Sequence, residues 1–409
     1  MLDVGIIGAG TAGTAAALFL ARSGHAVTLY ERVPNPGPVG AGIVLQPSGL
    51  AVLQRLGMMR DVADRGSPLT RLRCETAAKK TVIDLEYTSL GPDHQGYGLH
   101  RGVLFEHLHR AILKEPAIEL RCGCAIDSFG RANRGKRYVV DSEGVELGPH
   151  DLIVVADGAR SHLRDGASQH KSVTPYPWGA LWFIGKDPEN LFAGELHQIV
   201  EGPQRMLGFL PTGLGPGEGA TPLVSLFWSL RADLFGQWQR DGLEAWKASI
   251  RAYAPHAEPL LEQIVDPQQI TFAGYHDVVM DPWNTRNVVF IGDAAHATSP
   301  QLGQGCNLAL YDAMILSDCV AEVPFLPSAL DEYSRRRKDH LAFYQFATRW
   351  LTPFFQSDYG VLGLLRDALM GPMCRIPFIR REMVRSMTGT KAGMLFGDIA
   401  RDERPYDRL

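Results

Sequence analysis

A carboxylate and a run of glycines lie close together near residue 300. Gly292-Asp293 follows the apolar segment 287–291 and precedes a loop rich in glycine, serine and proline that ends at Asn307. The β-branched composition predicts a buried strand over 287–291, and the spacing of apolar residues predicts a helix from about Cys306. An aspartate at a strand end would then face a helix N-terminus. The helix N-terminus offers free N–H groups and a positive dipole end. Together with the carboxylate, it could bind a polyol hydroxyl and an electron-rich ring edge.

A second glycine motif lies at the start of the chain. Gly8-x-Gly10-x-x-Gly13 joins a predicted strand over 2–7 to a predicted helix, and a second strand over 26–30 ends at Glu31. In this context the glycines allow a tight turn, close approach to a pyrophosphate and close helix–strand packing. The helix N-terminus can bind phosphates, and Glu31 can bind the adenosine ribose. The pattern predicts an adenine dinucleotide, and the acidic residue favours FAD or NAD over NADP.

Three further positions could join this site. Gly40-Ala-Gly42 is another glycine-rich segment, Arg101 lies near the start of a predicted helix, and Asp157-Gly158 follows the predicted strand 151–155. From the residues alone, Arg101 fits a pyrophosphate contact and an ordinary surface arginine equally well. Asp-Gly is also a common turn, so Asp157-Gly158 has two interpretations.

Composition restricts the class of protein. A chain of 409 residues with 45% hydrophobic and 21% charged residues predicts a globular protein of two or three domains. The formal net charge of −4 argues against nucleic-acid binding, and the basic run 335–338 is interpreted as a solvated helix face. The six cysteines lack zinc spacing, which predicts no metal site, buried reduced thiols and a cytoplasmic location. No apolar run reaches the roughly 18 residues of a membrane span.

The elements that position these residues fall into three regions. Aromatic residues and short alternating strands dominate 172–271, which predicts a strand-rich domain. Its aromatic side chains suit a core, with an apolar substrate pocket as the alternative. The apolar stretch 361–379 predicts a buried packing helix, and a face lying on a membrane surface is the alternative. We do not expect membrane contact.

Taken together, these residues resemble the class A flavoprotein monooxygenases, the family typified by p-hydroxybenzoate hydroxylase. The three motifs at Gly8–Gly13, Asp157-Gly158 and Gly292-Asp293 match in order and spacing over about residues 1–335. The resemblance implies an α/β fold: a Rossmann-like FAD-binding domain, an inserted strand-rich substrate domain and C-terminal helices. The expected boundaries are 1–171 with 272–335, then 172–271, then 336–409. Whether 76–95 joins the substrate sheet is left open.

The resemblance also implies roles for residues. Asp293 would bind the ribityl chain, Arg101 would contact the sugar-phosphate arm, and Asp157-Gly158 would support both FAD and the nicotinamide cofactor. The catalytic positions lining the isoalloxazine would be Pro300, Gly303, Gly305 and Asn307. The full set expected to bind FAD is Gly8, Gly10, Thr11, Ala12, Gly13, Glu31, Arg32, Gly42, Arg101, Asp157, Gly158, Gly292, Asp293, Pro300, Gly303, Gly305 and Asn307.

The implied reaction is the hydroxylation of a small electron-rich aromatic, phenolic or enol compound. NADH or NADPH would reduce FAD, and dioxygen would then give a flavin C4a-hydroperoxide that attacks the substrate. A dehydrogenase or reductase of the same fold is the alternative. His296 is expected to be structural, and His197 and Tyr176 are candidate bases by residue type only. The oligomeric state is left open.

Overall fold

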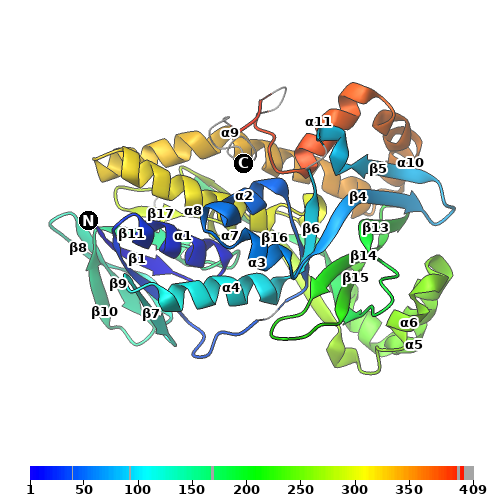
Figure 1. Cartoon of the computed structure of the whole chain (residues 1–409), viewed down its shortest axis with the longest axis horizontal. Helices are drawn as coiled ribbons and strands as arrows, with labels where there is room; N and C mark the ends of the chain where they lie inside the picture. The colour runs from blue at the N-terminus through cyan, green and yellow to red at the C-terminus, as the bar shows by residue number, and fades with distance from the viewer. Residues whose placement is uncertain (39, 92–93, 167–169, 394–396, 400–409) are drawn as a thin grey trace.

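The computed structural model describes residues 1–38, 40–91, 94–166, 170–393 and 397–399. A five-stranded parallel sheet, ordered β17-β11-β1-β2-β7, forms one half of the molecule (Figure 1). Its strands are β1 (Asp3–Ile7), β2 (Ala26–Glu31), β7 (Ile118–Cys122), β11 (Leu152–Val155) and β17 (Val288–Phe290). They are rich in Val, Ile and Leu because helices and a small sheet bury them on both faces.

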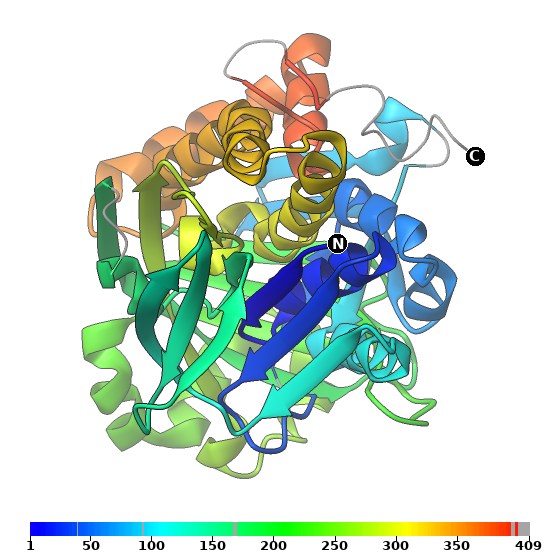
Figure 2. The same ribbon diagram turned by 90° about the vertical axis from the view of Figure 1, so that its left-hand side faces the viewer.

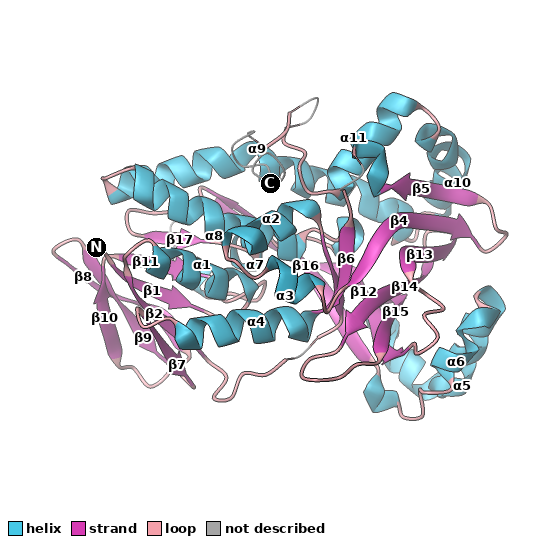
Figure 3. Cartoon of the chain, viewed as in Figure 1, coloured by secondary structure: helices cyan, strands magenta, loops and turns pink. Residues whose placement is uncertain are grey.

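Helices cover one face of this sheet (Figure 3). They are α1 (Thr11–Arg22), α2 (Pro47–Arg55), α3 (Met59–Ala63), α4 (Arg101–Lys114) and α8 (Gly305–Glu322). A three-stranded antiparallel sheet of β8 (Ile126–Asn133), β9 (Lys136–Asp141) and β10 (Glu146–His150) lies beside it, at the end of the molecule shown in Figure 2. His150 of β10 hydrogen-bonds Tyr30 of β2 at 2.9 Å.

A nine-stranded sheet forms the other half. Its main order is β16-β12-β15-β14-β13-β4-β6-β3, with β5 paired to β4. The strands are β3 (Gly42–Leu45), β4 (Ser67–Thr76), β5 (Thr81–Glu86), β6 (Gly96–His100), β12 (His170–Lys186), β13 (Gly194–Glu201), β14 (Arg205–Leu214), β15 (Pro222–Arg231) and β16 (Thr271–Asp281). Strands from 42–100 therefore share one sheet with strands from 170–281. The domain boundaries stay a prediction.

Helices also pack on the large sheet. On one face lie α5 (Phe235–Tyr253) and α6 (Glu258–Leu261), whose apolar side chains join a core with Phe183, Phe209 and Trp228. The C-terminal helices are α9 (Leu326–Phe355), α10 (Gly360–Cys374) and α11 (Pro377–Met387). Helix α9 runs beside α8, and α10 and α11 lie near β4 and β5 (Figure 1). These elements confirm the predicted α/β class.

The C-terminal helices depart from two predictions. Arg337 of the basic run is fully buried, although its neighbours Arg335 and Lys338 are exposed. The stretch expected to form a buried packing helix is two helices, and α10 leaves Val361, Leu364 and Leu369 exposed. None of the helices in the described part of the chain is long and apolar enough to cross a membrane.

The cysteines also depart in part from their prediction. All six are free thiols, as expected, but only Cys74, Cys319 and Cys374 are buried. Cys122 is exposed because it ends β7, the edge strand of the parallel sheet.

Candidate active site

The three glycines of the N-terminal motif differ in geometry, and each geometry fits one of the tasks predicted for the motif: a tight turn, close helix–strand packing and close approach to a pyrophosphate. Gly8 has φ of +99°, a left-handed backbone that favours glycine. A Cβ on Gly13 would lie 1.9 Å from the Gly8 carbonyl oxygen, so only glycine allows this approach of α1 to β1. A Cβ on Gly10 would meet no described atom within 4 Å. Gly10 therefore presents its backbone to open space at the N-terminus of α1, beside Thr11 and Ala12.

Glu31 ends β2 beside this loop. Its carboxylate accepts hydrogen bonds from the backbone N–H groups of Ala9 and Val33, each at 2.9 Å. These bonds fix the side chain next to the glycine motif while each oxygen keeps a lone pair for a ligand hydroxyl. Arg32 is exposed.

Asp157-Gly158 follows β11, the strand adjacent to β1. A Cβ on Gly8 would lie 2.9 Å from the Asp157 Cα, so the two turns are in contact. Asp157 Oδ1 is buried and has no hydrogen-bond partner among the described residues. Burial raises the pKa of this carboxyl above its ordinary value. A buried acceptor without a partner at this place fits a ligand that brings its own donor.

Asp157→Asn is expected to stabilise the ligand-free protein at neutral pH. Because the folded-state pKa is raised, the proton stabilises the folded protein below the ordinary value of 3.8. That contribution is lost as the pH rises through the raised value. The neutral amide does not undergo this loss. Thermal melting should show the variant above wild type at pH 7, with the gap narrowing toward pH 4. A variant that melts below wild type at pH 7 would contradict the argument.

Asp293 lies at the second motif. Gly292 has φ of +59°, and its N–H donates to Asp312 Oδ2 at 2.8 Å. A Cβ on Gly292 would lie 2.9 Å from the Ala12 Cβ, so this turn contacts the start of α1. Asp293 begins the short helix α7 (Asp293–His296) with its side chain exposed. A Cβ on Gly305, at the start of α8, would lie 3.9 Å from Asp293 Oδ1. The carboxylate therefore lies beside the N-terminus of this helix, as the sequence predicts.

A buried polar network supports this turn. His296 Nε2 lies 2.5 Å from Asp312 Oδ2, and Arg337 Nε donates to Asp312 Oδ1 at 2.7 Å. Burial opposes ionisation of Asp312, but His296 and Arg337 hold its pKa well below the ordinary range. His296 is 4% exposed and bonded to Asp312 within the core, which fits the structural role expected of it.

The loop after α7 divides into exposed and buried positions. Pro300, Gly303 and Gly305 line a cavity, and Gly303 has φ of +61°. Asn307 is not among the residues that line it, and its contact with a bound ring stays a prediction. Its side chain is fully buried. It accepts from the Gln46 N–H at 2.8 Å and donates to the carbonyls of Val44 and Gly303 at 2.9 and 3.1 Å. Asn307 therefore joins β3 to the loop.

Gly42 and Arg101 complete the set of sequence-predicted residues. A Cβ on Gly42 would lie 2.4 Å from Thr212 Cγ2, so glycine lets β3 pack tightly against β14. Arg101 starts α4, is exposed and lines the same cavity as Asp293. The structure thus brings Arg101, Asp293 and the loop at 300–305 to one cavity.

That cavity has a volume of about 640 Å³ and lies between the loop, the large sheet and the C-terminal helices. Trp182 and Phe227 line it together with Trp350 and Phe355 of α9. Part of the aromatic set of 172–271 therefore lines a pocket, and other members, such as Phe183 and Trp228, lie in the core. Gln46, Gln198 and Tyr275 also line it, although no sequence motif indicates a role for them. Period-two alternation along β13 could have placed Gln198 opposite His197, but not near the loop at 300.

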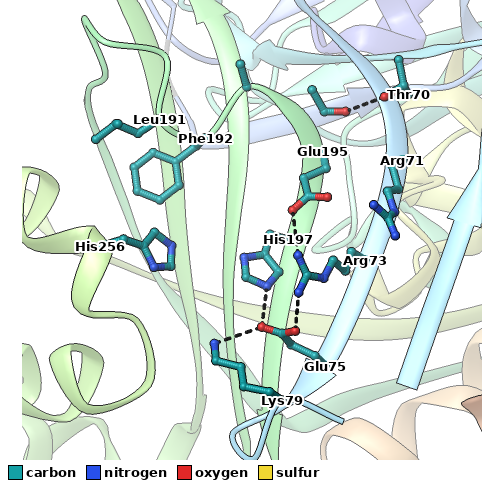
Figure 4. Close-up of a pocket in the computed structure, with 12 residues that line it drawn as sticks. Thr70, Arg71, Arg73, Glu75, Lys79, Leu191, Phe192, Glu195, His197 and His256 are labelled. Carbon is teal, nitrogen blue, oxygen red and sulfur yellow. Dashed lines mark hydrogen bonds and ion pairs between the residues drawn. The ribbon is translucent and has the colours of Figure 1, made fainter. Parts of the chain in front are cut away.

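A second hollow, of about 530 Å³, lies on the other face of the same sheet (Figure 4). His197, a candidate base, lies here with its Nε2 3.2 Å from Glu75 Oε1. It does not line the cavity beside Asp293, and neither does Tyr176. His197 faces this hollow and its neighbour Gln198 faces the cavity, because successive side chains of a strand point to opposite sides of the sheet.

Comparison with known proteins agrees with this geometry. The family model described as FAD binding domain matches residues 1–344. The chain is 28% identical over 370 residues to kynurenine 3-monooxygenase of Salinispora arenicola (strain CNS-205), covering 82% of this chain and 76% of that one. It is 29% identical over 397 residues to 3-amino-4-hydroxybenzoate 2-monooxygenase of Streptomyces cremeus, covering 90% and 91%.

Solved structures show the same fold. The tetrameric form of 2-methyl-3-hydroxypyridine-5-carboxylic acid oxygenase superposes with a TM-score of 0.73 at 23% identity, covering 96% of this chain and 98% of that one. At this identity the likeness supports the fold alone. The predicted arrangement of a parallel-sheet domain with a second large sheet is confirmed.

Proposed function

Because the chain belongs to the FAD-binding domain family, we propose that its glycine motifs bind FAD, so that the flavin ring faces the apolar cavity. The chain is an FAD-dependent monooxygenase that uses NAD(P)H and hydroxylates aromatic compounds. The alternative of a dehydrogenase or reductase is not supported by these relatives. The observation that supports the proposal most is the meeting of the Gly8, Asp157 and Gly292 turns at the ends of β1, β11 and β17.

Different residues would bind different parts of FAD. The N–H groups at the start of α1 would hold the pyrophosphate beside Gly10, and Glu31 would bind the adenosine ribose. Arg101 would contact the sugar-phosphate arm, and Asp293 would accept hydrogen bonds from the ribityl hydroxyls. When bound, the flavin supplies the redox chemistry that NAD(P)H starts and dioxygen completes.

The loop and α8 provide the reactive surroundings. Pro300, Gly303 and Gly305 would contact the flavin ring. The first turn of α8 contains no acidic residue, so its positive dipole end would favour negative charge on that ring. The aromatic and methionine side chains of the cavity exclude water from the reacting atoms. We propose that this takes place in the cytoplasm, where free thiols such as the six of this chain persist.

Asp293→Ala is expected to weaken FAD binding about tenfold or more, because hydrogen bonds to an ionised carboxylate contribute roughly 1.5–3 kcal/mol. FAD fluorescence titration of the flavin-free protein measures the dissociation constant. Asp318→Ala is the matched control, since Asp318 lies on α8 in a surface pair with Arg55. Unchanged FAD affinity in Asp293→Ala would refute the assignment of the ribityl chain to this residue.

The reaction itself is tested by turnover. Purified yellow protein should oxidise NADH or NADPH faster when an aromatic substrate is present. The product should gain one oxygen atom from ¹⁸O₂, measured by mass spectrometry. Oxidation that transfers electrons to another acceptor, with no oxygen gained by any aromatic compound, would contradict the proposal.

A further inference from the structure

The large sheet separates charged from uncharged side chains. Along β4, Arg71, Arg73 and Glu75 face the hollow of Figure 4, where Arg73 donates to Glu75 at 2.6 Å. The intervening residue Leu72 lines the opposite cavity beside the loop at 300. In β13, Glu195 and His197 face the charged hollow, whereas Leu196 and Gln198 line the cavity. The alternation directs one class of side chain to each face.

The cavity beside the loop is consequently apolar. Among the residues that the structure describes, the charged ones lining it are Arg101 and Asp293, the two assigned above to the cofactor. The wall opposite is made of aromatic, aliphatic and methionine side chains, and the methionines are Met206, Met370, Met373, Met383 and Met387. Methionine and aromatic side chains adapt to flat apolar molecules and give no compensation for a buried charge.

The polar groups on this wall are neutral. The backbone of Gln198 pairs with β14 and β4, but its side-chain amide makes no hydrogen bond to another described residue, so this amide can both donate to and accept from a ligand. Tyr275 accepts from Trp182 Nε1 at 3.4 Å, and burial raises its pKa to about 12. Tyr275 therefore stays protonated at neutral pH and can donate to a substrate oxygen.

We propose that this enzyme takes a neutral, apolar aromatic substrate and discriminates against aromatic carboxylates. The proposal rests on the proposed function, because it concerns the substrate of that same site. A carboxylate on this wall would lose its hydration without gaining a cationic partner from the described residues of the wall, which is strongly unfavourable. A phenol would keep hydrogen bonds to the amide of Gln198 or the hydroxyl of Tyr275. Two of the relatives named above, by contrast, are named for a benzoate and a carboxylic acid.

The test compares matched ligands. The flavin-loaded protein is titrated with 2-naphthol and with 3-hydroxy-2-naphthoate, which differ by one carboxylate. A second pair is 4-phenylphenol and 4′-hydroxybiphenyl-4-carboxylate. Binding is measured calorimetrically and by quenching of tryptophan fluorescence, since Trp182 and Trp350 line the cavity. We expect the neutral member of each pair to bind about 100-fold more tightly or better.

The second part of the test introduces a positive charge into the cavity. Gln198→Arg should raise the affinity for the carboxylates at least about tenfold and lower that for the neutral partners. Gln198→Met is the matched control of similar length without charge, and it should keep the wild-type preference. Flavin content and melting temperature check that each variant folds. The wild-type comparison stands even if Gln198→Arg does not fold.

The outcomes separate this inference from the proposed function. Carboxylates that bind as well as their neutral partners would overturn the inference, as would a failure of both neutral compounds to bind. An enzyme that hydroxylates only carboxylates would retain the proposed function and lose this inference. A protein that binds the neutral compounds but never incorporates oxygen would retain the preference for neutral ligands and contradict the proposed function.

Discussion

Arg337→Met is expected to destabilise the protein by about 3–5 kcal/mol, the effect typical of removing one member of a buried ion pair. Arg337 and Asp312 are both fully buried, and Arg337 Nε donates to Asp312 Oδ1 at 2.7 Å. Without the guanidinium, Asp312 would keep its contacts with His296 and the Gly292 N–H but would lose its cationic partner Arg337. Since that N–H belongs to the turn that positions Asp293, flavin binding should weaken as well.

The measurement is the free energy of unfolding from urea denaturation, together with the FAD dissociation constant. Arg335→Met is the matched control, because Arg335 lies on the same helix with a side chain that is 72% exposed and paired with Glu332. Surface pairs of this kind contribute at most about 1 kcal/mol, so the control should unfold close to wild type. Equal destabilisation by the two variants would show that the buried network does not stabilise this turn.

The same network adds an acid-sensitive contribution. The pKa of Asp312 is held below that of the unfolded chain, so its stabilisation is present above the unfolded value and is lost as the pH falls. In Arg337→Met part of that depression disappears. The stability difference between wild type and variant should therefore shrink at acid pH, as measured by melting temperature across a pH series.

The network also shows what a sequence can and cannot predict. The N-terminal strand, glycine turn, helix and second strand follow from neighbouring residues, and the structure has β1, α1 and β2 where the pattern places them. The burial of Arg337 depends on Asp312, which lies on a different helix 25 residues earlier. Helical periodicity gives no information on which face of α9 meets α8, so a basic run predicts an exposed surface.

The cavity is harder still to predict, because its lining residues range from Gly42 to Met387. Gln198 and Tyr275 have no local motif, and only the pairing of β16, β12, β15, β14 and β13 places them on one wall. Asn307 shows a similar limit. Its position in the loop predicts contact with the flavin ring, and the sequence alone does not indicate that its amide bonds backbone groups of Val44 and Gln46.

Gly13→Ala and Gly10→Ala are expected to fail in different ways, although the glycines lie in one motif. A Cβ on Gly13 would lie 1.9 Å from the Gly8 carbonyl oxygen and 3.1 Å from the Gly8 carbonyl carbon. These are backbone atoms, which cannot move without separating α1 from β1. Gly13→Ala should therefore destabilise even the flavin-free protein by about 1–3 kcal/mol or more and abolish FAD uptake.

Gly10→Ala should leave the flavin-free protein close to wild type, within about 0.5 kcal/mol. Gly10 has φ of −77° and ψ of −173°, which alanine adopts without strain, and a Cβ there meets no described atom within 4 Å. The methyl group would instead occupy the space through which a pyrophosphate approaches the N–H groups of α1. We expect FAD to bind at least about tenfold more weakly to this variant.

The pair of variants distinguishes packing from ligand contact. Melting of the flavin-free proteins by circular dichroism reports packing, and FAD titration reports the contact. A Gly10→Ala variant that binds FAD like wild type would place the pyrophosphate away from this loop. Loss of stability in that same variant would mean that Gly10 serves the fold rather than the ligand. The expected result is therefore an intact fold with weakened FAD binding. That result would mean that the backbone of Gly10 is exposed so that the phosphates can lie directly against it.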